Sequence, residues 1–134
     1  MNWRNFDYYI TEKGSEHYFE SGWAVSNTGF LRYKNHLIEK FSKDKKGHPH
    51  QLILNLSNEY ISVKICRIVA LNFNENKRGL LHVKHTDGDI CNNIATNLYW
   101  SGANPRTIES DDANYATECT WRSPIQAMKN YLTF

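Results

Sequence analysis

The chain has 134 residues, which is enough for one compact domain or for two small lobes around a shared core. Hydrophobic residues make up 40% of it, no apolar run approaches the roughly 20 residues that span a bilayer, and the N-terminus lacks the layout of a signal peptide. Three cysteines without a CxxC pair argue against a disulfide framework and a zinc ribbon, so we expect a protein of the reducing cytoplasm.

Positive charge is concentrated in the middle of the chain. The net charge is only +2, but residues 31–84 carry eleven Lys and Arg against four acids, a net +7, and the remainder sums to −5. A basic middle between acidic ends is typical of a surface that binds phosphates. Uneven charge on a solvated surface explains the same numbers equally well, and both interpretations stay open at this point.

The N-terminal half is expected to be β structure. The first twenty residues have no clear period, but residues 23–25 and 30–33 predict two strands joined by a turn at 26–29, where Asn27 and Gly29 tolerate a positive φ. Residues 41–49 predict a basic loop, and residues 60–63 a strand that returns from a turn at 57–59. Residues 51–57 alternate strictly, which predicts a half-buried strand. Its two faces carry Leu52, Leu54 and Leu56 on one side and Gln51, Ile53 and Asn55 on the other.

The second half changes period. Ile65, Ile68, Val69 and Phe73 recur at helical spacing, which predicts a helix over 64–73 that the polar run 74–79 ends. Short strands are expected at 80–83 and 98–100, with a turn at 86–89 between them. The tail beyond 105 is expected to be helical in part, with segments near 113 and over 125–131.

A spaced motif lies between residues 82 and 100. His85 follows a predicted strand, Asp87-Gly88 comes next, Asn93 and Asn97 stand eight and twelve residues after the histidine, and a Leu-x-Trp triplet closes the segment. This pattern closely resembles the HNH nuclease motif, the ββα-metal or His-Me finger. Taken alone, His85 would more often be a surface histidine, but its place in the motif favours a catalytic role.

Sequence further upstream supports the same resemblance. Residues 65–73 are similar to the helix that precedes this motif in phage and intron-encoded HNH homing endonucleases, and residues 23–32, with Trp3, resemble their N-terminal module. The resemblance covers about residues 3–100. It implies an α+β fold: a NUMOD4-like antiparallel β module over 1–62 in probable contact with DNA, a ββα finger with its preceding helix over 63–116, and a helical tail of unknown role over 117–134.

The resemblance implies a DNA endonuclease that nicks or cuts phosphodiester bonds, encoded by a phage or mobile element and acting in the cytoplasm of a bacterial host. A histidine near its ordinary pKa is neutral and basic at cellular pH, so His85 is expected to deprotonate the attacking water from a groove that a phosphate can enter. Asn97, with Asn93, is expected to position the loop, and Asp87 to shape the turn. Double-stranded DNA is the expected partner, with phosphate contacts from Arg32, Lys34, Lys45, Lys46, Arg67 and Lys84. For Arg67 a second role stays open, which is to brace the motif.

Three positions depart from the family pattern and bear on activity. Lys84 stands where the family has Asp or Asn, and a protonated lysine repels a metal ion. Arg106 falls where the last metal ligand is expected, which leaves Asn104 as the candidate ligand for a divalent ion, Mg²⁺ or Mn²⁺, unless the loop is longer and Asp111, Asp112 or Asn114 serves. Cys66 replaces a helix histidine. A zinc site from His82, His85, Cys66 and Cys91 fits no common ligand spacing.

These departures support an alternative function. Catalysis is lost in this interpretation, and the basic surface is kept as a DNA-binding regulator or as a phage-encoded inhibitor of a host protein. A third interpretation keeps slow, metal-free cleavage, with the charge supplied by Lys84 or Arg106.

Overall fold

The computed structural model describes residues 1–102, which form short antiparallel strands around one helix. This confirms the expected α+β class. No helix within these residues is long and apolar enough to cross a membrane. In chain order the elements are β1 (Trp3–Asn5), β2 (Tyr8–Ile10), β3 (Glu16–Tyr18), β4 (Trp23–Ser26), β5 (Leu31–Tyr33), β6 (His36–Leu37), β7 (Ser42–Lys43), β8 (Pro49–Leu54), β9 (Tyr60–Lys64), α1 (Ile65–Phe73), β10 (His82–His85), the 3₁₀ turn η1 (Ala95–Asn97) and β11 (Leu98–Ser101).

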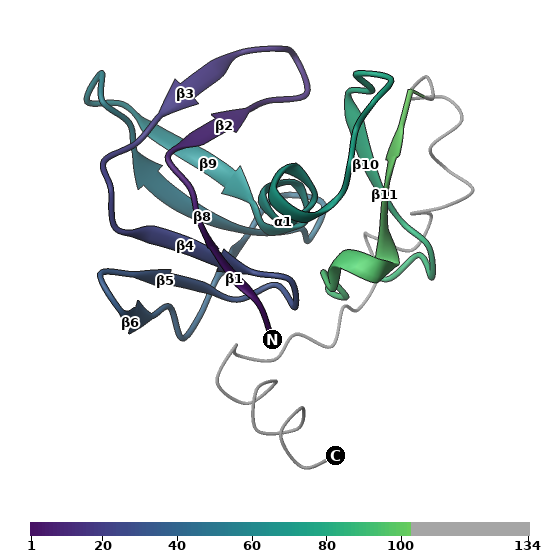
Figure 1. Ribbon diagram of the computed structural model, residues 1–134, viewed down its shortest axis with the longest axis horizontal. Coiled ribbons are helices and arrows are strands. Elements are labelled where there is room, and N and C mark those ends of the chain that lie inside the picture. The colour runs from purple at the N-terminus through teal and green to yellow at the C-terminus, as the bar shows by residue number, and fades with distance from the viewer. Residues whose placement is uncertain (103–134) are drawn as a thin grey trace.

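The strands form a four-stranded sheet in the order β1-β4-β5-β6, a three-stranded sheet β7-β8-β9, and two hairpins, β2-β3 and β10-β11. A bridge between Phe19 and Asn55 ties the first hairpin to the three-stranded sheet. Helix α1 lies between this β module and the β10-β11 hairpin, and it packs against strands of both (Figure 1). Helix α1 therefore packs between the two parts of the described chain and connects them.

Helix α1 begins directly after β9 and is buried on more than one face. The periodic residues Ile65, Ile68 and Val69 are buried as expected, and so are Cys66, Arg67 and Ala70 between them. A helix that is buried all round belongs to the interior of a fold rather than to its surface. The hydrophobic core that includes these helix residues also contains residues of the β module and, from β11, Leu98: Phe6, Tyr9, Phe19, Val25, Leu31, Phe41, Ile53, Val63 and Leu98.

Asn74 holds the end of the helix against the hairpin. Its main-chain N–H donates to the carbonyl of Ala70, and its side-chain amide donates to the carbonyls of Ala95 and Leu98 at 3.0 and 2.8 Å. Its own carbonyl accepts a hydrogen bond from the indole of Trp100 at 3.1 Å. The Asn74 side chain thus satisfies two main-chain carbonyls of the hairpin segment, and the Trp100 indole satisfies the Asn74 carbonyl at the helix end.

Strand β8 alternates as expected, but its leucine face is the one in solvent. Ile53 is 1% exposed and packs in the core, whereas Leu52 and Leu54 are about half exposed. Asn55 is buried because its side-chain oxygen accepts the main-chain N–H groups of Ser57 and Glu59, both at 2.9 Å, and so forms the turn to β9. Strands β1, β2 and β3 lie where the sequence had no clear period.

Candidate nuclease site

His85 is the last residue of β10 and faces Leu98 of β11 in the antiparallel ladder. Its Nε2 lies 2.8 Å from Oδ1 of Asn93. An amide oxygen only accepts hydrogen bonds, so Nε2 carries a proton and donates it to this bond. Asn93 therefore sets both the tautomer and the direction of the imidazole.

The ring of His85 is 0% exposed, and Asn93 is also buried. This differs from the expectation of a histidine that faces an open groove. In this conformation the ring is out of contact with bulk water. Any reaction at Nδ1 requires that the surface above the ring open.

The loop between the two strands is organised by Asp87 and Asn97. The amide of Asn97 donates to Asp87 Oδ1 at 2.9 Å and to the carbonyl of Asn92 at 2.8 Å, while Asn92 donates to Asp87 Oδ2 at 2.8 Å. Partial burial alone would raise the pKa of Asp87, but these bonds, with the main-chain N–H of Asp89, hold its pKa below the usual range. Both oxygens of the Asp87 carboxylate thus accept hydrogen bonds from residues of this loop.

The N-terminal β module also supports Asn93. Gly29, in the turn between β4 and β5, has φ +91° and is buried against Asn93: a Cβ at position 29 would lie 3.2 Å from both the Cβ and the carbonyl oxygen of Asn93. The same turn accepts a hydrogen bond at the carbonyl of Asn27 from the N–H of Ala95, at 2.8 Å. A side chain at 29 would press on the residue that orients His85.

A second histidine, which the sequence analysis did not single out, lies beside the first. The rings of His48 and His85 have centroids 6.4 Å apart, and His48 Nδ1 is 3.6 Å from Asp44 Oδ1. Partial burial raises the pKa of Asp44, but the main-chain N–H of His48, the charge of that ring and the N–H of Lys46 together lower it. His48 and His85 are 37 residues apart, so no local spacing could have indicated that they meet.

Two of the residues expected to contact phosphate are buried, and the structure corrects that expectation. Arg67 is 2% exposed, donates to the carbonyls of Ile10 and Leu81, and stacks on Trp100. Lys84 is 3% exposed, in the middle of β10 opposite Tyr99. A guanidinium held by two internal carbonyls, or an ammonium below the surface, does not reach a phosphate on DNA.

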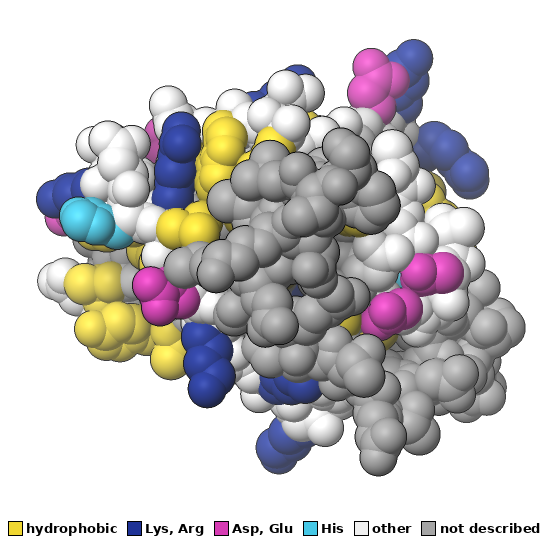
Figure 2. Space-filling view, turned by 90° about the horizontal axis from the view of Figure 1, so that it is seen from below, with side chains coloured by type: hydrophobic (Ala, Val, Ile, Leu, Met, Phe, Trp, Pro, Cys, Tyr) yellow, Lys and Arg dark blue, Asp and Glu magenta, His cyan; other side chains and the backbone are white. Residues whose placement is uncertain are grey.

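The other four expected contacts lie nearer the surface. Arg32 stacks over Trp3, with its guanidinium carbon 4.3 Å from the ring, and Lys34 lies over Tyr33. Both line a cavity of about 380 Å³ beside β4. Lys45 and Lys46 are exposed in the turn between β7 and β8. On the face seen in Figure 2, the Lys and Arg side chains that are in view are spread over several places.

The described residues do not make a divalent metal site. Within residues 1–102 no three His, Cys, Asp or Glu side chains gather so that they could hold an ion, and this includes the zinc set considered above. Lys84 directly precedes His85, and a protonated lysine repels a divalent ion instead of binding it. Asn104, Arg106 and the alternative ligands at 111, 112 and 114 lie outside the described residues.

Comparison with known proteins finds a solved structure with a similar fold. No known family profile and no curated protein matches the sequence. The solved structure described as "DNA binding and cleavage by the HNH homing endonuclease I-HmuI" is similar, with a TM-score of 0.59 and 22% identity over 99% of this chain and 68% of that one. The chain therefore has the fold of an HNH homing endonuclease, as the motif at 82–100 predicted.

Proposed function

We propose that this protein is an HNH-type endonuclease that hydrolyses phosphodiester bonds in double-stranded DNA. The observation that carries the proposal is the hydrogen bond from His85 to Asn93 at the end of β10, within a fold shared with a DNA-cleaving enzyme. The three domain boundaries, the NUMOD4-like character of residues 1–62 and the phage or mobile-element origin stay predictions of the sequence.

His85 acts as the general base in this proposal. With Nε2–H hydrogen-bonded to Asn93, Nδ1 of the neutral ring accepts a proton from the water that attacks phosphorus; the P–O bond to the 3′ oxygen breaks, and that oxygen leaves and takes up a proton from water. A positioned base of this kind contributes about 10²–10⁴-fold to a rate. Because the ring is buried, the proposal requires that it become accessible when DNA binds.

Asn97 acts one step further away, as a positioning residue. Through Asp87 and the carbonyl of Asn92 it holds the loop that carries Asn93. The electrostatic contacts with DNA come from Arg32, Lys34, Lys45 and Lys46. Each phosphate contact releases condensed counterions, so binding weakens steeply as salt rises.

The family resemblance implies a divalent ion, but the described residues do not fit one, and no step is assigned to it here. Asn104 remains the candidate ligand in the sequence. Metal dependence is therefore decided by assay with Mg²⁺, Mn²⁺ or EDTA.

A second function is favoured by two specific observations, the burial of His85 and the lysine beside it. In this candidate the fold is kept for binding DNA, as a regulator, or for inhibiting a host protein, and catalysis is absent. It makes the opposite prediction in a cleavage assay.

The test is nicking of supercoiled plasmid with Mg²⁺, Mn²⁺ or EDTA. We compare the wild-type protein with His85→Ala, Asn93→Ala and, as a matched histidine control, His36→Ala, since His36 is exposed on β6. The nuclease proposal expects nicking that falls about 10²–10⁴-fold in His85→Ala, about 10–100-fold in Asn93→Ala, and not in His36→Ala. If the folded wild-type protein shifts DNA in a gel but never nicks it, the second function is correct.

A further inference from the structure

The outward face of the three-stranded sheet carries an apolar groove that the proposed function does not use. Leu52, Leu54, Leu56 and Tyr60 are 50%, 44%, 63% and 71% exposed. Leu54 and Tyr60 are direct partners in the β8-β9 ladder, so their side chains share one face. With Trp23 and Tyr33 these residues line a groove of about 320 Å³.

The groove is lined by polar residues as well (Glu20, Gln51, Asn55 and Asn58), but its four exposed apolar side chains lie together on one face. A large apolar side chain has about 150–250 Å² to bury, so these four, which are 44–71% exposed, leave roughly 450 Å² of mostly apolar surface in water. The largest apolar patch on a typical monomer is about 300–600 Å² and often marks a binding site. Single exposed leucines need no explanation, but four lining one groove do.

Charge argues against DNA as the occupant. Among the described residues that line the groove there is no Lys or Arg, and the one charged residue is Glu20. Glu59 is exposed in the adjoining turn, between Asn58, which lines the groove, and Tyr60. The charged groups at the groove are thus few and, with Lys34 over Tyr33 at its edge, of both signs, unlike the basic surface that binds a phosphate backbone. They fit a protein surface better than DNA.

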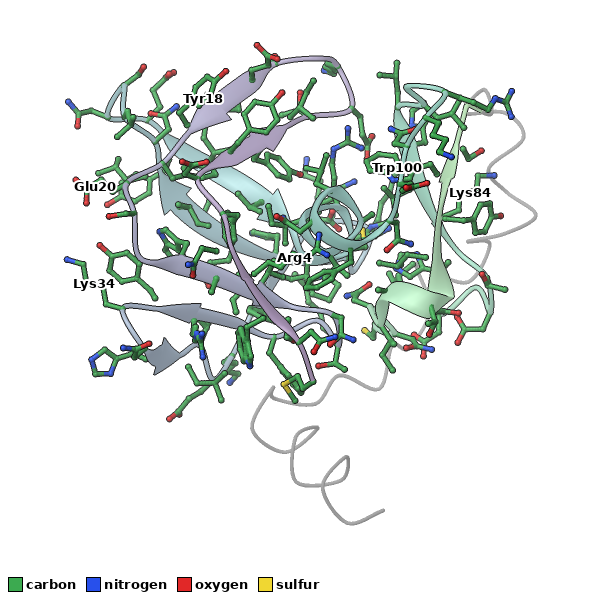
Figure 3. The ribbon with its side chains drawn as sticks, in the orientation of Figure 1. Arg4, Tyr18, Glu20, Lys34, Lys84 and Trp100 are labelled. Carbon is green, nitrogen blue, oxygen red and sulfur yellow. The ribbon has the colours of Figure 1, made fainter. Side chains whose placement is uncertain are left out.

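Area and charge both fit a second copy of this chain. Packed face to face about a two-fold axis, two such grooves would bury about 900 Å² from the four side chains alone. This is just below the roughly 1,000–1,200 Å² at which specific interfaces begin, and Trp23 and Tyr33, which are partly exposed in the same groove, add to it. Lys34 lies over Tyr33 and so borders the same groove as Glu20, and both stand on the same side of the molecule (Figure 3). The rim thus carries both signs of charge, as a self-complementary contact requires.

We infer that the face formed by Leu52, Leu54, Leu56 and Tyr60 is the contact surface of a symmetric homodimer. The contact packs the outward leucines of two β8 strands against each other, as in face-to-face sheet packing. Its area is at the low end for specific association, so we expect a weak dimer that is populated only at high protein concentration. The inference is independent of whether the site at His85 is active.

The test is sedimentation velocity of the full chain from 1 to 200 µM. The wild-type protein is expected to pass from monomer to dimer across this range. Leu54→Glu places an unpaired carboxylate in the contact, near the same carboxylate of the other protomer. It should raise the dimer dissociation constant at least about tenfold. Leu81→Glu is the matched control, since Leu81 is 48% exposed and does not line the groove, and it should change nothing.

Far-UV circular dichroism of both variants checks that they fold, and Tyr60→Ser is a second variant of the same face. A wild-type protein that stays monomeric at 200 µM overturns the inference, as would happen if another segment of the chain covered the groove. A dimer that Leu54→Glu and Tyr60→Ser both leave intact overturns it as well. So does a loss of DNA affinity in Leu54→Glu without any change in mass.

Discussion

Arg67 provides the sharpest test of the structure, because two incompatible roles can be assigned to it. The sequence left two roles open for this helix residue, contact with DNA phosphate or support of the motif. In the structure it is buried, and its guanidinium joins the carbonyl of Ile10, at the end of β2, to that of Leu81, just before β10. We expect Arg67→Met, which keeps most of the side chain's length and removes the donors, to destabilise the fold.

The magnitude follows from the two bonds. A hydrogen bond from a charged donor contributes about 1.5–3 kcal/mol, and a carbonyl left buried without a partner costs a similar amount. The apolar side chain of methionine recovers part of this, because an arginine no longer has to be desolvated. The expected loss is about 2–4 kcal/mol, a large share of the roughly 5–15 kcal/mol that stabilises a typical domain.

Urea unfolding followed by tryptophan fluorescence measures the loss, since Trp100 lies against the Arg67 guanidinium. With an m-value of about 2 kcal/mol/M, the midpoint should fall by about 1–2 M. Arg32→Met is the control and should shift it far less, because Arg32 is only partly buried over Trp3. An Arg67→Met protein of wild-type stability that binds DNA more weakly would refute this account and restore the phosphate contact.

Three further predictions follow from the site and its supports. Gly29→Ala should cost about 2–4 kcal/mol in urea unfolding, because the new Cβ adopts a left-handed φ and presses on Asn93; wild-type stability would show that the turn yields easily. Asn97→Ala should lower any nicking activity about tenfold or more and increase amide hydrogen exchange in residues 86–97; unchanged exchange there would contradict its role in the loop. Glu12→Gln should remove roughly 0.5 kcal/mol at pH 7, because the ion pair with Lys64 is partly in solvent. Although partial burial favours the neutral acid, Lys64 lowers the Glu12 pKa in the folded state. The difference in unfolding free energy between wild type and Glu12→Gln is therefore fully present above the unfolded pKa, about 4.3, and disappears as pH falls through the folded pKa. A difference that grew in acid would contradict this.

Local pattern was enough to predict the elements that have a clear period or motif. The helix at 65–73, the β4 and β5 strands and the hairpin around His85 all lie within a residue or two of their expected places. Strands β1, β2 and β3 were not predicted, because each has three residues and such short segments show no alternation. They are strands because neighbours distant in sequence pair with them, as Ser26 does with Trp3.

Burial of the charged residues could not be read from their local context. Arg67 is stable in the interior because Ile10 and Leu81, 57 residues before it and 14 after, offer carbonyls to its two donors. The same limit applies to the β8 leucines: alternation shows that a strand has two faces, and only packing against α1 decides which one is buried.

The sequence by itself determined the spacing of His85, Asp87, Asn93 and Asn97, and with it the hairpin and loop they form, because those contacts span at most twelve residues. Only the tertiary structure decided that His85 is buried, that His48 lies beside it and that Gly29 supports Asn93. These depend on contacts between segments more than thirty residues apart, where the packing of α1 and the turns of the β module, rather than local pattern, set which side chains meet.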